Sequence, residues 1–145
     1  MLVSAACASA ALAQDALDPT DEYRLKAAFL FNFATFTQWP KDNSASLLVC
    51  IYGHAPFGPH LDAIAGRKVG GRSLQVLRVN SVDSLDGCQL VFVTRAVIGN
   101  LARVLDRVDG RAVLIVADSP GAMQNGAMLN MDTNADRISF SANLA

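Results

Sequence analysis

EYRLKAAFLFNFATFTQWP (residues 22–40) is the most apolar long segment of the chain, and the fold depends on it. It contains four of the seven phenylalanines and the only tryptophan. Leu25, Phe29 and Phe33 recur at helical spacing, and the other apolar residues extend their face almost around the cylinder. About ten apolar-rich residues cannot cross a bilayer core of roughly 30 Å. We therefore expect a buried helix that the rest of the protein covers on both sides.

The flanking residues indicate where this helix begins and ends. Asp18 can cap the free N–H groups, Pro19 suits the first helical position, and Asp21 lies favourably at the positive end of the helix dipole. Pro40 disfavours helical geometry at Trp39, so we expect the helix to end there.

Composition places the chain among compact soluble proteins. Its 145 residues are enough for one domain with a substantial core. Apolar residues make up 52% of the chain, yet no run approaches the roughly 20 consecutive apolar residues of a membrane helix. The net charge of −1 creates no field that would attract nucleic acid, so we expect no nucleic-acid partner.

The N-terminus resembles an export signal. Residues 1–13 carry no charge and end in Ala11-Leu12-Ala13, the small-residue pattern that precedes signal-peptide cleavage. We expect residues 1–13 to be a signal peptide that lacks its basic start, residues 14–20 a linker, and residues 21–145 one α/β domain. An Ala-rich tail is one alternative, and a lipoprotein site at Cys7 is another.

Cleavage after Ala13 would leave two cysteines, Cys50 and Cys88. In an exported protein an even pair indicates one disulfide, which would stabilise the fold by about 4 kcal/mol in the chain-entropy model. Two buried thiols in adjacent strands are the alternative. The two cysteines are far apart in the sequence, so we expect no metal site.

Short apolar runs alternate with helical segments after residue 40. Strands are expected at residues 47–52, 74–79, 89–93 and 112–117, helices at 59–65 and 96–108, and a closing hairpin at 126–132 and 137–141. Residues 66–72 are expected to form a turn or a short hairpin. This order predicts a three-layer α/β fold, with a mainly parallel sheet of about five to six strands, helices on both faces and a C-terminal β-hairpin.

No set of residues forms a recognisable catalytic centre. Gly66–Arg72 is glycine-rich and basic, but it leads into a strand and not into the helix that a phosphate-binding loop requires. His54 and His60 are six residues apart, a spacing that suits neither one face of a helix nor one face of a strand. Ser119 lacks the G-x-S-x-G elbow, and Asp118 stands alone. We therefore expect a protein that is not an enzyme and needs no cofactor.

Ligand binding without catalysis is the alternative function. The carboxyl ends of parallel strands form crevices that hold small molecules. Here those ends fall at residues 53–58, 80–81, 94–95 and 118–119, which are polar or glycine-rich. An extracytoplasmic small-molecule-binding sensor module would use these loops.

Five segments, in order, resemble the YfiR family of small periplasmic regulatory domains. They are YRLKAAFLFNFATFTQWP, LLVCIYGHAPFGPHL, GRKVGGRSLQVLRV, LDGCQLVFV and NGAMLNMDTNADRISFSANLA. The resemblance spans residues 21–144. It implies a disulfide between Cys50 and Cys88, and structural signature positions at Asn32, Trp39, Pro40, Gly53, Gly58, Cys88, Asn130 and Asn143. It also implies that the domain lacks the family's final helix.

The resemblance further implies a function and partners. A YfiR-like protein in the periplasm restrains an inner-membrane diguanylate cyclase through the cyclase's periplasmic sensory domain, which lowers cyclic di-GMP and disfavours biofilm growth. An outer-membrane lipoprotein antagonist can sequester the repressor. We therefore expect a periplasmic, non-catalytic, homodimeric regulator whose exposed partner contacts are Trp39, Phe57, Arg67 and Arg72.

Overall fold

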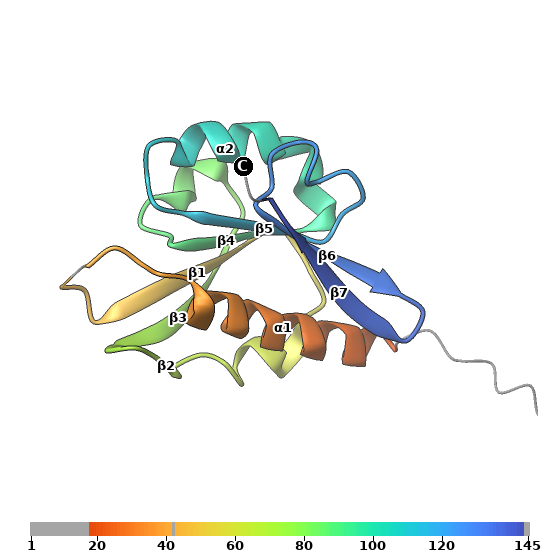
Figure 1. Cartoon of the computed structure of the whole chain (residues 1–145), viewed down its shortest axis with the longest axis horizontal. Helices are drawn as coiled ribbons and strands as arrows, with labels where there is room; N and C mark the ends of the chain where they lie inside the picture. The colour runs from red at the N-terminus through yellow and green to blue at the C-terminus, as the bar shows by residue number, and fades with distance from the viewer. Residues whose placement is uncertain (1–17, 42, 144–145) are drawn as a thin grey trace, which may run out of the picture.

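The computed structural model describes residues 18–41 and 43–143, and its centre is a seven-stranded curled sheet (Figure 1). The strand order is β2-β3-β1-β4-β5-β6-β7, in which β3, β1, β4, β5 and β6 are parallel. Strands β2 and β7 are antiparallel to their neighbours and form the two edges. The bounds are β1 Ser46–Tyr52, β2 Lys68–Val69, β3 Arg72–Val79, β4 Leu90–Val93, β5 Leu114–Ala117, β6 Leu129–Asn134 and β7 Arg137–Ala142.

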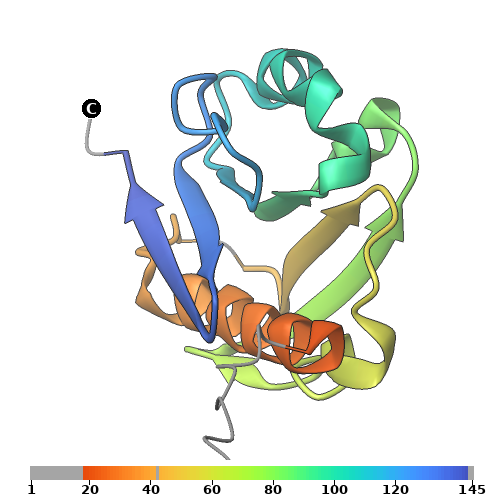
Figure 2. The same cartoon turned by 90° about the vertical axis from the view of Figure 1, so that its right-hand side faces the viewer.

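Helices lie on both faces of the sheet, as Figure 2 shows most clearly. Helix α1 (Pro19–Phe36) covers one face, and α2 (Leu101–Val108) covers the other. Three 3₁₀ helices, η1 (Gly58–Leu61), η2 (Val82–Leu85) and η3 (Arg95–Asn100), complete the described elements. Neither α-helix in the described part of the chain combines the length and the apolarity needed to span a bilayer.

Helix α1 begins as its sequence predicts but ends earlier. The Asp18 carboxylate accepts a hydrogen bond from the Thr20 N–H at 2.9 Å, and Pro19 occupies the first turn. The last helical residue is Phe36, because Thr37 turns to extended geometry and its hydroxyl donates to the Phe33 carbonyl at 2.6 Å. Trp39 lies beyond the helix, so the prediction that the helix ends there is wrong by one short turn.

The covering of α1 is also less complete than predicted. Leu30 and Phe33 pack into the core with Ala27 and Ala34. Phe36, however, is 82% exposed, so the expectation of a helix covered on both sides is wrong at its C-terminal turn.

The strands form where short apolar runs were predicted. All four residues of β4 are buried, as are Val49 to Tyr52 of β1, because both strands lie in the middle of the sheet. Residues 66–72, expected to form a turn or a short hairpin, form the short hairpin, in which the two-residue β2 pairs with β3. This extra strand makes the sheet seven-stranded, against the expected five to six.

The predicted helix at residues 96–108 divides into two. Residues 95–100 form η3, where Val97 has non-helical backbone angles, and only residues 101–108 are α-helical. Val97 also approaches the end of β1 closely. A Cβ on Gly53 would lie 2.6 Å from a methyl group of Val97 and 2.4 Å from the Thr94 hydroxyl, so Val97 fills the space above this glycine.

The disulfide between Cys50 and Cys88 is present, and the alternative of two free thiols is wrong. Cys50 lies in β1, and Cys88 lies just before β4, its sheet neighbour. Both residues are buried in the layer beneath α2. The predicted signal peptide, the start of the linker and Cys7 lie outside the described residues.

Candidate functional site

A buried ion pair joins α1 to the carboxyl end of β5. The Lys26 side chain is completely buried in the middle of α1, and its ammonium group donates to Asp118 at 2.7 Å and to Glu22 at 2.9 Å. Asp118 directly follows β5, and its side chain is 1% exposed. The expectation that Asp118 stands alone is wrong. Its partner, Lys26, is 92 positions away, and no local sequence pattern connects the two residues.

Two further side chains enclose the ion pair. The Arg95 Nε donates to the Asp118 backbone carbonyl at 3.1 Å and lies 3.6 Å from its carboxylate. The Tyr23 ring lies 4.6 Å from the Lys26 ammonium. Burial raises the pKa of the Tyr23 hydroxyl, and the negative charge of Asp118 raises it further. At neutral pH this tyrosine is therefore an uncharged partner of the lysine.

Within this cluster of Glu22, Tyr23, Lys26, Arg95 and Asp118, the Lys26–Asp118 pair is closed to solvent. Arg95 lies at the rim, and its side chain is 51% exposed. The side chains of Glu22, Lys26 and Asp118 are much less exposed, at 15%, 0% and 1%. Nearby, the buried side-chain oxygens of Thr94 and Ser119 and one carboxylate oxygen of Asp118 have no hydrogen-bond partner among the described residues. The arrangement fixes α1 against the sheet and presents no exposed nucleophile.

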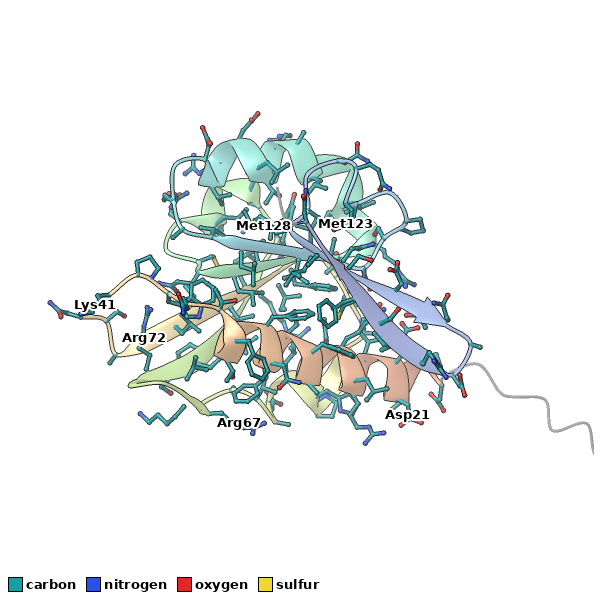
Figure 3. The ribbon with its side chains drawn as sticks, viewed as in Figure 1. Asp21, Lys41, Arg67, Arg72, Met123 and Met128 are labelled. Carbon is teal, nitrogen blue, oxygen red and sulfur yellow. A yellow bond between two sulfur atoms is a disulfide. The ribbon has the colours of Figure 1, made fainter. Side chains whose placement is uncertain are left out.

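The predicted contacts Trp39 and Arg72 line one groove, which we call the partner groove. Figure 3 shows two of its lining residues, Lys41 and Arg72, at the same end of the molecule. The volume of the groove is about 640 Å³, and it lies between the end of α1, the segment around Lys41 and the β2–β3 turn. The Trp39 indole donates to the Ala34 carbonyl at 2.8 Å, and the Arg72 guanidinium donates to the Ser46 carbonyl at 2.7 Å. Both side chains are therefore held in place by backbone groups.

The other two predicted contacts do not line this groove. The Arg67 guanidinium stacks over the Phe31 ring at 3.9 Å, on the outer side of α1, and Arg67 remains exposed. Phe57 is fully buried between Tyr23 and Phe92, with ring centroids 5.0 and 5.6 Å away. The expectation that Phe57 is an exposed contact is wrong, because its apolar ring fills the core above β4.

The signature positions implied by the resemblance have local structural roles where their contacts are resolved. The Asn130 amide accepts from the Ser119 N–H at 3.1 Å and donates to the Ser119 carbonyl at 3.0 Å, which ties the turn after β5 to β6. Gly53 and Gly58 have φ of +89° and +54°. The remaining three, Asn32, Pro40 and Asn143, are exposed.

A small crevice lies at the carboxyl ends of β4 and β5. Its volume is about 400 Å³. It is lined by Ile98, Gly99, Leu101, Ala102, Pro120, Ala122 and Asn125. None of the strand-end residues predicted from the sequence lines this crevice. The nearest is the turn after β5, predicted at residues 118–119, whose next residue, Pro120, is part of the lining. No group of three or more His, Cys, Asp or Glu side chains suited to a metal ion occurs in residues 18–41 and 43–143.

Comparison with curated proteins gives no match. Comparison with protein-family models matches the YfiR/HmsC-like family over residues 23–145, which begins at Tyr23 in α1 and runs through the whole sheet. That range contains both buried cysteines, the ion cluster apart from Glu22, and the partner groove. The chain therefore belongs to the YfiR/HmsC-like family.

Proposed function

We propose that this protein is a non-catalytic periplasmic regulator that binds the periplasmic sensory domain of an inner-membrane diguanylate cyclase and restrains it. The family match carries the proposal, because the YfiR-like family is regulatory and periplasmic and the match includes every described strand. Restraint of the cyclase would lower cyclic di-GMP. An outer-membrane lipoprotein would act as the antagonist by sequestering the regulator.

The disulfide supports a periplasmic location. Disulfides form and persist in oxidising compartments such as the periplasm and are rare in the cytosol. Cys50 and Cys88 are both buried, so the disulfide is part of the core and does not lie on the surface. Export through residues 1–13 remains a prediction from the sequence.

The partner groove is the contact surface that we propose for the cyclase domain. Tryptophan and arginine are the residue types most often found at energetic hot spots of protein interfaces. Trp39 and Arg72 lie in one groove with Lys41, and backbone hydrogen bonds already order the first two. An ordered contact surface loses less conformational entropy when it binds.

Capture of the cyclase's periplasmic domain by the oxidised protein tests this function. We expect the wild-type chain to retain the domain, and Lys41→Glu to weaken capture by about tenfold, equivalent to roughly 1.4 kcal/mol. Arg103→Glu is the matched control, because Arg103 is an exposed cation on α2 in the opposite layer. No capture by the oxidised wild-type protein would remove the proposal, and equal losses in both variants would remove the groove as the contact.

The crevice at the ends of β4 and β5 supports a second function, a small-molecule-binding sensor. Its position matches the place where open parallel sheets hold ligands. A thermal-shift screen with amino acids and nucleotides tests it. We expect one compound to raise the melting temperature of the wild type and to leave Gly99→Trp, which fills the crevice, unchanged. A shift of equal size in both proteins would place the ligand elsewhere.

A further inference from the structure

Three cations lie on one side of the molecule, beginning in the partner groove. Lys41 and Arg72 line the groove, and Arg67 precedes Val69, another lining residue, by two positions. Residues two positions apart in an extended segment are separated by about 7 Å. Figure 3 shows Lys41 and Arg72 close to one end of the molecule and Arg67 nearer its middle. A partner that fills the groove therefore has Arg67 within its reach.

Arg67 and Val69 face the same layer of the protein. The Leu74 N–H donates to the Arg67 carbonyl at 2.8 Å, so the ladder between β2 and β3 continues to Arg67. Side chains alternate between the two faces of a strand. The contacts agree with this alternation, because Arg67 stacks over Phe31 of α1 and Val69 packs into the core beneath the same helix. Lys68, which lies between them in β2, is exposed on the other face.

The guanidinium of Arg67 is held in place without being neutralised. It lies 3.9 Å from the centroid of the Phe31 ring, a cation–π contact that orders an exposed side chain. Within residues 18–41 and 43–143 it forms no ion pair and no side-chain hydrogen bond. A guanidinium presents its donors as a rigid fork that matches a carboxylate, which it binds through two parallel hydrogen bonds. The stack therefore favours a carboxylate as the partner of Arg67.

The charge of this side of the molecule also favours an acidic partner. Among the described residues that line the groove, none is acidic. Lys41, Arg67 and Arg72, together with Asp42 next to Lys41 in the sequence, carry three positive charges and one negative charge, a net charge of +2. The acidic start of α1 is distant, because Figure 3 shows Asp21 toward the other end of the molecule.

We propose that the segment of the cyclase sensory domain that enters the partner groove is acidic, and that one of its carboxylates binds the Arg67 guanidinium. The inference rests on the function proposed above and names the chemistry of the partner at that surface. An anionic membrane fits less well, because lipid recognition uses clusters of about four to eight cations. This surface has three among the described residues, and one of them is fixed in the geometry that suits a single carboxylate.

Titration of the cyclase's periplasmic domain against the oxidised protein tests the contact at Arg67. We expect Arg67→Glu to raise the dissociation constant by at least about tenfold. Arg67→Lys keeps the charge but loses the two-bonded geometry, and it should raise the constant by about threefold. Arg103→Glu makes the same change of charge in the opposite layer and should bind as the wild type does. Equal affinities of the wild type and a folded Arg67→Glu, checked by circular dichroism, would overturn the proposal and leave the proposed function in place.

The dependence of this affinity on salt tests the charge of the partner. The Debye length falls from about 10 Å at 0.1 M salt to about 3 Å at 1 M. We expect added sodium chloride to raise the dissociation constant of the wild type, and to raise that of Arg67→Gln less steeply. A dissociation constant that does not change with salt would contradict an acidic partner segment.

A peptide probe separates this proposal from the proposed function. A short fluorescent peptide that alternates glutamate with valine presents carboxylates on an extended backbone, and its lysine–valine counterpart is the control. We expect the wild type to bind only the acidic peptide, and Arg67→Glu to bind it at least about tenfold more weakly. If the cyclase domain is not captured but this peptide binds, the function fails and the acidic recognition surface stands. If neither binds, both fail.

Vesicles of phosphatidylglycerol test the other anionic occupant. We expect the wild type and Arg67→Glu to sediment with these vesicles equally little. Sedimentation of the wild type that Arg67→Glu abolishes would overturn the proposal, because it would assign the surface to lipid.

Discussion

Lys26 shows how one residue can connect two parts of the fold. Its ammonium group is completely buried and is neutralised by Asp118 and Glu22, so removal of the lysine leaves a buried carboxylate with the partly exposed Arg95 as its remaining cationic neighbour. Loss of one partner from a buried ion pair costs about 3–5 kcal/mol. We expect Lys26→Met to lower the unfolding free energy by about 3 kcal/mol, measured by urea denaturation of the oxidised protein.

Arg24→Met provides the matched control on the same helix. Arg24 pairs with Asp21 at 3.2 Å, but both side chains are more than half exposed. Exposed pairs contribute about 0–1 kcal/mol, so this variant should change stability by less than about 0.5 kcal/mol. Equal losses in the two variants would mean that the buried pair contributes no more than the surface pair.

Residues differ in how far the sequence alone reveals their positions. Asp18 and Pro19 were placed correctly, because capping depends on neighbouring backbone groups. Phe57 was misplaced, since a loop aromatic carries no periodicity to show which way it points. Lys26 gave one usable signal, a lone cation in the apolar part of α1, but its partner Asp118 is joined to it only through the tertiary structure.

Elements were predicted most reliably where the pattern is local. Continuous apolar runs mark β1 and β4, because central parallel strands are buried on both faces. The two-residue β2 has no pattern of its own and exists through pairing with β3. The amphipathic stripe at residues 96–108 predicted one continuous helix, because it carries no signal for the non-helical backbone of Val97, which packs against Gly53, a residue distant in sequence.

The contact between the end of β1 and η3 makes a prediction for this pair of elements. Gly53 has φ of +89°, and a Cβ there would lie 2.4 Å from the Thr94 hydroxyl and 2.6 Å from a Val97 methyl group. Overpacking costs about 1–3 kcal/mol and an unfavourable backbone region about 1–3 kcal/mol more. We expect Gly53→Ala to lower the unfolding free energy by about 3 kcal/mol in urea titrations.

Gly58→Ala separates the two causes. Gly58 also has positive φ, at +54°, but a Cβ there meets nothing within 4 Å. Only the backbone contribution applies, so the loss should be about 1 kcal/mol. If both alanine variants unfold at the same urea concentration, the packing of η3 against β1 does not depend on this glycine.

At the scale of the whole molecule, the sheet separates two apolar layers that are stabilised differently. The layer beneath α1 is rich in aromatic rings, including Tyr23, Phe57 and Phe92, which meet edge to face in series. The layer beneath α2 is mostly aliphatic and contains the disulfide. The short α2, with eight residues, covers its side of the sheet with the help of η2 and η3. We infer that the cross-link compensates for limited helical cover on this side.

The last prediction follows from that difference between layers. Cys50 and Cys88 close a loop of 38 residues, for which the chain-entropy model gives about 4 kcal/mol. Domains of this size have unfolding free energies of roughly 5–15 kcal/mol, so the double variant Cys50→Ala/Cys88→Ala should fold only marginally at 25 °C. Urea titration should place its midpoint well below that of the oxidised wild type. With dithiothreitol present during the titration, the unfolding curve of the wild type should shift to that of the variant, and the curve of the variant should not change. If dithiothreitol leaves the wild-type curve unchanged, the disulfide adds no stability.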